Sequence, residues 1–317
     1  MIHDNGLGRE TDVGEQTGQA AYNPFTGKGY NPKVKDSNFT GFIEKLHLRD
    51  ESGRVREETV PSLPEMIQNI HDAGTDLVLQ LDFKDKEAVE PAYWQLKGLK
   101  NAAGVPANEW CIYKLQATWW RTPEEFEALP WVRDAFRSGI QLAYIPVYNP
   151  IDEAAWDTLN GLKGFLRTNY TISAEIELYS PNGPLQQLLD HVKGLDYSNE
   201  AFRTSGIFFD TANYSLPADI RVKNSVYVFQ DNKAPALLDS IVGNKSVDGH
   251  DYRSDFAWIL ETGFNWVITD TPDEWDRRLR EQGRRNVKRL FADGQHAIDQ
   301  ALEAGWYRRR HAKDFSG

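Results

Sequence analysis

From about residue 60 onward, short apolar strand patterns alternate with helical patterns, and this alternation restricts the fold more than any other feature. The first helix, within residues 60–74, has a capping box at Ser62 and Glu65. Strands separated by helical patterns of ~10–16 residues are typical of βαβ units around a parallel sheet. The expected strands are residues 75–85, 110–117, 140–148, 170–178, 206–210, 225–231 and 265–270. Helical patterns occupy residues 87–102, 122–139, 151–166, 183–195 and 252–263, and a last helix begins at residue 272.

Within three of these strands, polar residues alternate with apolar ones and gather toward the carboxyl end. A parallel strand covered on both faces should be apolar throughout. In a TIM barrel, by contrast, inward-pointing residues reach the active-site mouth at the carboxyl ends of the strands. We therefore expect an α/β fold of the TIM (β/α)8 type, with an open sheet that has one wet face as the alternative. The alternating residues are Gln80, Asp82 and Lys84, then Lys114 and Gln116, and finally Ser173, Glu175 and Glu177.

The two ends of the chain differ from this regular part. Residues 1–60 are rich in turns and carry little hydrophobic periodicity, which indicates a long loop region, near residues 5–60, on the active-site side, with short strands near residues 39–50. Residues 285–317 are strongly basic, as a solvated face of a terminal helix or tail would be. Composition does not change abruptly anywhere, so we expect residues 1–317 to form a single domain.

Charge and hydropathy exclude some classes of partner. The formal net charge of −11 repels nucleic acid and anionic membranes, so an anion site would need a local basic pocket. No run of ~18 apolar residues occurs, so no transmembrane segment is expected. The single cysteine, Cys111, lies among apolar residues and reads as a small buried hydrophobe.

Four glycosylation sequons begin at Asn38, Asn169, Asn213 and Asn244. They favour a secreted, extracellular glycoprotein if a leader precedes this sequence, and a cytoplasmic protein otherwise.

Asp82 and Lys84 are two residues apart on one strand, so their side chains share a face. The carboxylate suits Mg²⁺ or Ca²⁺ and the ammonium suits a phosphate oxygen, although a plain buried ion pair is the alternative. Lys114, Gln116 and Glu177 are candidate substrate-binding residues at neighbouring strand ends.

Trp119 follows one of these strands. It could line an apolar or choline-type pocket by cation–π contact, although most such aromatic residues belong to a core.

Four segments in order, HDNGLGRETD, VPSLPEMI, LQLDFK and WVITDTPDEW, resemble the glycerophosphodiester phosphodiesterase family. That family belongs to the phospholipase C-like phosphodiesterase superfamily of TIM barrels. The resemblance implies a metal-dependent enzyme that hydrolyses small-molecule or lipid phosphodiesters to an alcohol and glycerol phosphate, as part of lipid metabolism. It matches His3 to one of two catalytic histidines, Lys84 to the lysine beside the metal, and Asp82 to a metal ligand, with Mg²⁺ or Ca²⁺ as the cation.

The sequence also departs from the family pattern. The family begins with a strand ending in His-Arg-Gly, a Glu-Asn pair and a Glu-x-Asp strand, none of which has a counterpart here. We therefore expect a barrel that is incomplete at its N-terminus. Two alternatives stay open: an inactive relative that keeps a phosphate pocket at Lys84 and Lys114, and a lipid phosphodiesterase similar to sphingomyelinase D, which shares the Asp-x-Lys strand.

Overall fold

The computed structural model describes residues 4–23, 27–50, 53–75, 77–150, 156–193, 203–208, 247–264, 266–269 and 272–284. The chain divides into two compact units, residues 1–267 and 268–317. The first unit holds an N-terminal segment and an α/β region. The second contains helix α12 (Pro272–Glu281). The expected strand at 225–231 and the basic residues 285–317 lie outside the described residues.

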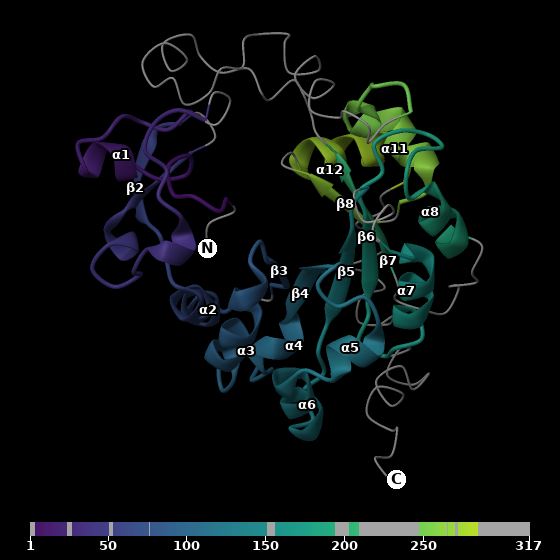
Figure 1. Ribbon diagram of the computed structural model, residues 1–317, viewed down its shortest axis with the longest axis horizontal. Helices are drawn as coiled ribbons and strands as arrows, with labels where there is room; N and C mark the ends of the chain where they lie inside the picture. Colours follow the sequence, from purple (N-terminus) through teal and green to yellow (C-terminus); the bar gives the residue numbers. More distant parts are fainter. Residues whose placement is uncertain are drawn as a thin grey trace. The chain divides into compact units, whose positions relative to one another are not determined.

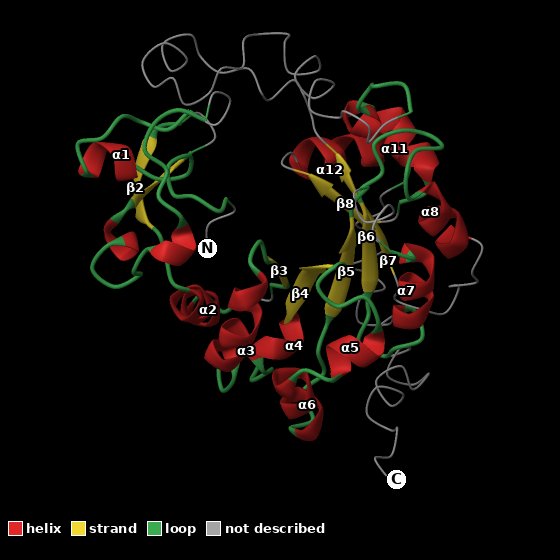
Figure 2. Ribbon diagram, viewed as in Figure 1, coloured by secondary structure: helices red, strands yellow, loops and turns green. Residues whose placement is uncertain are grey.

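A sheet forms the centre of the α/β region, as the alternating pattern predicts (Figure 2). In the described part of the chain it has six strands in the order β3-β4-β5-β6-β7-β8. The pairs β3–β4, β4–β5, β5–β6 and β6–β7 are parallel. The strands are β3 (Leu79–Asp82), β4 (Cys111–Gln116), β5 (Tyr144–Tyr148), β6 (Ser173–Ile176), β7 (Arg203–Phe208) and β8 (Trp266–Thr269).

Helices lie between successive strands, which is the arrangement of βαβ units (Figure 1). Ser62 caps α2 through the predicted capping box with Glu65. Pro130 starts a second helix inside 122–139, so that pattern forms two helices rather than one. The helices of this region are α2 (Leu63–Asp72), α3 (Val89–Leu96), α4 (Ala107–Trp110), α5 (Pro123–Glu127), α6 (Pro130–Arg137), α7 (Thr158–Phe165), α8 (Gln186–Lys193) and α11 (Phe256–Thr262), with short 3-10 turns at Lys86–Ala88 and Tyr252–Ser254.

The two faces of the sheet differ as the strand patterns predict. On β4, Cys111, Tyr113 and Leu115 are buried in the main hydrophobic core. That core also contains residues of α2, α3, α4, α5, α6 and α7, so these helices cover one face of the sheet. Ile112 belongs to a separate small cluster, and Lys114 shares its side of β4. The polar residues therefore lie on the face opposite the helix layer.

The N-terminal segment is more ordered than the long loop that its sequence indicated, although a short strand does lie within residues 39–50, as expected. Leu7, Val13, Ile43, Leu46 and Val60 form a buried cluster of their own. These residues are widely spaced in the sequence, so they produce no periodicity that a helix or strand pattern would reveal. The elements are α1 (Val13–Gln16), the 3-10 turns Val34–Asp36 and Ile43–Lys45, and the antiparallel pair β1 (His47–Arg49) and β2 (Val55–Thr59).

Asp12 joins α1 to β1 inside this segment. Its Oδ1 accepts the backbone N–H of His47 at 2.8 Å, and its Oδ2 lies 2.9 Å from His47 Nδ1. The carboxylate is almost fully buried, so these contacts replace the water that it loses.

Membrane insertion through a helix has no support in the described residues. Each helix there is too short or too polar to cross a bilayer.

Candidate functional site

Four charged side chains meet where β3, β4 and β6 end, and we call them the charge cluster: Asp82, Lys84, Lys114 and Glu175. The β3–β4 register places Asp82 beside Lys114, and Lys114 Nζ lies 3.0 Å from Asp82 Oδ2. The same carboxylate oxygen accepts a hydrogen bond of 2.9 Å from Lys84 Nζ. Asp82 therefore holds two ammonium groups, one of which comes from its own strand end, as the Asp-x-Lys spacing predicts.

Lys114 also contacts Glu175 from the far side. The Nζ–Oε2 distance is 3.2 Å, but the geometry falls outside that of a hydrogen bond, so the contact is an ion pair. The side chains of Lys114 and Glu175 are 8% and 3% exposed, whereas Asp82 and Lys84 are about a third exposed. The cluster thus has a buried half, Lys114 with Glu175, and a half that reaches the surface, Asp82 with Lys84.

Burial and charge shift the pKa values of this cluster in different directions. Burial alone would raise the pKa of Asp82, but Lys114 and Lys84 together lower it below its usual value. Burial would lower the pKa of Lys114, but the carboxylates of Glu175 and Asp82 raise it, so Lys114 stays charged. Burial raises the pKa of Glu175 in spite of Lys114. Of Asp82, Lys114 and Glu175, only Glu175 has a pKa shift that disfavours its charged form.

Sequence reasoning selected Glu177 as a site residue and left out Glu175. Both belong to one alternating strand pattern, but Glu175 lies inside β6, where it pairs with Val147, whereas Glu177 follows the end of that strand. Glu175 could have been selected from the predicted strand order. Lys114 and Glu175 belong to strands that are separated only by β5, so two charged side chains on the same face would lie close together. Glu177 contacts Tyr179, whose hydroxyl lies 3.5 Å from Glu177 Oε2.

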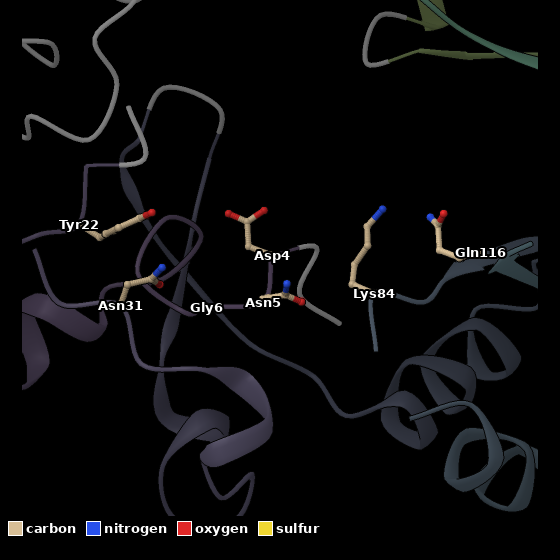
Figure 3. A pocket seen from close by; sticks show the side chains of 7 residues that line it. All are labelled: Asp4, Asn5, Gly6, Tyr22, Asn31, Lys84 and Gln116. Atoms are coloured by element: carbon tan, nitrogen blue, oxygen red, sulfur yellow. The ribbon is translucent and has the colours of Figure 1, made fainter. Parts of the chain in front are cut away.

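A pocket of about 400 Å³ lies beside the exposed half of the cluster. Lys84 and Gln116, from the carboxyl ends of β3 and β4, line it on the strand side (Figure 3). Residues of the N-terminal segment line it as well, and Figure 3 shows their side chains around the same space: Asp4, Asn5, Gly6, Tyr22 and Asn31.

Hydrogen bonds within the N-terminal segment fix this second wall. Arg9 donates from Nε and Nη2 to the two carboxylate oxygens of Asp4, at 2.6 and 2.7 Å. Gly8 N donates to Asn31 Oδ1 at 2.8 Å. A Cβ at Gly6 would come within 2.1 Å of Asn31 Oδ1, so a larger residue there would displace the Asn31 amide. These contacts hold Asp4 and Asn31 in place at the pocket.

The structure brings some of the predicted site residues together and separates others. Lys84 and Gln116 share the pocket, and Gln116 Oε1 accepts a 3.2 Å hydrogen bond from Asn149. Trp119 does not line this pocket: it packs beside the main core and meets Trp120 edge-on. His3 lies outside the described residues. Asp4, Asn5 and Gly6 belong to the HDNGLGRETD segment that carries the family resemblance. Tyr22 and Asn31 had no signal in the sequence, because a predicted loop assigns them no partner.

The described residues do not fit a divalent cation. In the part of the chain that the structure describes, no three His, Cys, Asp or Glu side chains lie close enough together to hold a metal ion. Asp82, the predicted ligand, already has two ammonium partners. A cation would have to compete with both, so the charge cluster is built as an ion-pair network rather than as a ligand set.

Comparisons with known proteins do not name a family. No family model matches the chain, and neither the curated proteins nor the solved structures contain a significant match.

Proposed function

We propose that the protein is a phosphoric diester hydrolase that cleaves glycerophosphodiesters to an alcohol and glycerol phosphate. One observation carries the proposal: Lys84 stands at the wall of a pocket while Asp82 and Lys114 fix its surroundings. An ammonium group at a pocket wall suits a phosphodiester oxygen. The sequence resemblance to glycerophosphodiester phosphodiesterases supplies the reaction class.

The proposal includes a TIM-type barrel. It is supported by the parallel order of β3 to β7, by helices on one face and by polar residues on the other. In such barrels the catalytic groups lie at the carboxyl ends of the strands, which is where Lys84 and Gln116 are found.

In the proposed reaction, Lys84 contacts a non-bridging oxygen and stabilises the negative charge that grows there. Water attacks phosphorus directly, or a neighbouring hydroxyl of the substrate attacks first and forms a cyclic phosphodiester that water then opens to glycerol phosphate. In both cases the bond from phosphorus to the alcohol oxygen breaks. The attacking group loses a proton and the departing alcohol gains one. The resemblance gives one of these proton transfers to His3. We assign no step to a metal ion, because the described residues do not fit one.

A second candidate function is binding of a phosphodiester without cleavage. It is favoured by the state of Asp82, whose carboxylate is held by two lysines and is a poor candidate for a base or a ligand. Such a protein would bind the same compounds through Lys84 and release no product.

The test is an assay of the purified protein with glycerophosphocholine and glycerophosphoglycerol, in which glycerol phosphate and the free alcohol are quantified. Separate reactions contain Mg²⁺, Ca²⁺ or EDTA, so that any cation requirement is measured directly. A choline-bearing lysolipid is assayed in parallel, because headgroup release from it would indicate the sphingomyelinase D-like alternative. Absence of product in every reaction, together with binding of the same diesters measured by isothermal titration calorimetry, would contradict hydrolysis and favour the second candidate.

A further inference from the structure

The pocket beside Lys84 is lined mainly by neutral hydrogen-bonding side chains. Asn5, Tyr22, Asn31 and Gln116 contribute amides and a phenol, while Asp4 and Lys84 are its charged members. These groups surround a ligand with donors and acceptors rather than with apolar surface (Figure 3).

Two of the amides are already oriented by the protein. The oxygen of Asn31 accepts from Gly8, and the oxygen of Gln116 accepts from Asn149. The NH₂ group of each amide is then the part that a ligand can use. Together with Lys84 Nζ they offer N–H donors, which suit the oxygens of a phosphate and of hydroxyl groups.

The pocket is poorly suited to a quaternary ammonium group. Recognition of choline relies on several aromatic faces around the cation, and Tyr22 is the one aromatic residue among the pocket's described lining. The carboxylate of Asp4 is held at both oxygens by Arg9, so its charge is compensated inside the protein. Trp119, which the sequence suggested for choline, is absent from this lining.

We propose that the pocket selects a glycerophosphodiester whose alcohol is a polyol, with Lys84 on the phosphate. Tyr22, Asn31 and Asp4 would contact the hydroxyl groups of that alcohol rather than those of the glycerol that every glycerophosphodiester shares. This inference rests on the proposed function for its phosphodiester and adds the headgroup. A hydroxyl both donates and accepts, so it can use an amide NH₂, a phenol and a carboxylate at once.

The experiment measures binding by isothermal titration calorimetry and hydrolysis in parallel, with glycerophosphoglycerol and glycerophosphocholine as the probes. We expect glycerophosphoglycerol to bind at least about tenfold more tightly, as two or more extra hydrogen bonds would allow. Tyr22→Phe should weaken binding of glycerophosphoglycerol by about two- to tenfold and leave glycerophosphocholine unchanged. Tyr30→Phe is the matched control, because Tyr30 belongs to the same segment, packs in its core and does not line the pocket.

A second variant tests the amide without losing the fold. Asn31→Asp keeps the oxygen that accepts from Gly8 and replaces the NH₂ donor by an anionic oxygen. It should weaken binding of both diesters, because a new negative charge in the pocket repels the anionic phosphodiester, whereas Tyr22→Phe removes one hydroxyl contact and affects glycerophosphoglycerol alone.

The outcomes separate the two proposals. Equal affinity for the two diesters, or a preference for choline, overturns the polyol inference even if both are hydrolysed. Tight, Tyr22-dependent binding of glycerophosphoglycerol without hydrolysis supports the inference and overturns the hydrolase. If neither diester binds, both proposals are wrong.

Discussion

Lys114 lies between two carboxylates, with its Nζ 3.0 Å from Asp82 Oδ2 on the neighbouring strand. Glu175 approaches the same nitrogen at 3.2 Å from the buried side. The buried ion pair of Lys114 and Glu175 therefore helps to position Asp82, which in turn holds Lys84. Neither Lys114 nor Glu175 belongs to the Asp-x-Lys motif.

We expect Lys114→Met to destabilise the protein by about 3 kcal/mol or more, because it leaves Glu175 buried without its partner. The measurement is the free energy of unfolding in urea. Lys100→Met, at an exposed lysine, is the control and should stay within about 0.5 kcal/mol of the unsubstituted protein. An equal effect of the two substitutions would show that the buried pair is not formed.

Glu175 should make stability depend on pH. Its pKa is raised in the folded state by burial, above the ordinary value of 4.5. The folded protein then binds the Glu175 proton more tightly than the unfolded chain does, so this group favours folding at low pH. That contribution is lost as the pH rises from about 4.5 through the raised pKa. Unfolding in urea is measured at several pH values for the protein and for Glu175→Gln. The stability of the protein relative to the variant should fall as pH rises, and a rise instead would contradict the assignment.

We expect Lys84→Met to lower kcat/KM for glycerophosphodiester hydrolysis by about 10²- to 10³-fold, the usual loss for a donor that stabilises transition-state charge. Lys84 is partly exposed and Asp82 keeps Lys114 as a partner, so stability should change by less than about 1 kcal/mol. The comparison of kcat/KM with the unfolding midpoint separates loss of function from loss of fold. Unchanged kcat/KM would remove Lys84 from the proposed site.

The thiol of Cys111 should be inert in the folded protein. Its side chain is fully buried, and burial raises its pKa to about 12. At pH 8 only about one thiol in 10,000 would be ionised, and access is blocked as well. Ellman's reagent should therefore react with one thiol per chain in denaturant and with none in buffer over the same period. Fast labelling in buffer would show that β4 is not buried as described.

The N-terminal segment should behave as a folded part of the protein. Leu46 is 1% exposed in its core, so Leu46→Ala should cost about 2–4 kcal/mol. Leu77→Ala, at a leucine that is 45% exposed, is the control and should have little effect. Hydrogen exchange adds a local measurement, because Val60 N donates to Leu46 O and its amide should lose protection in the Leu46 variant.

The local part of this architecture was predictable from the sequence because its causes are local. The Ser62–Glu65 capping box, the period-two alternation in β4 and the proximity of Asp82 and Lys84 each depend on residues within a few positions of one another. The parallel sheet followed from the alternation of strands and helices. Closure of that sheet into a barrel and the catalytic role of His3 remain predictions.

Only the tertiary structure decided which distant residues meet. Lys114 and Glu175 lie on β4 and β6, with α5, α6, β5 and α7 between them in the chain, and the pairing of both strands with β5 brings their charges together. Asn31 faces the same pocket as Lys84 because the core around Leu46 folds the N-terminal segment, and that core leaves no periodic trace in the sequence. Periodicity reports the conformation of neighbouring residues, whereas a site depends on packing between residues far apart in the chain.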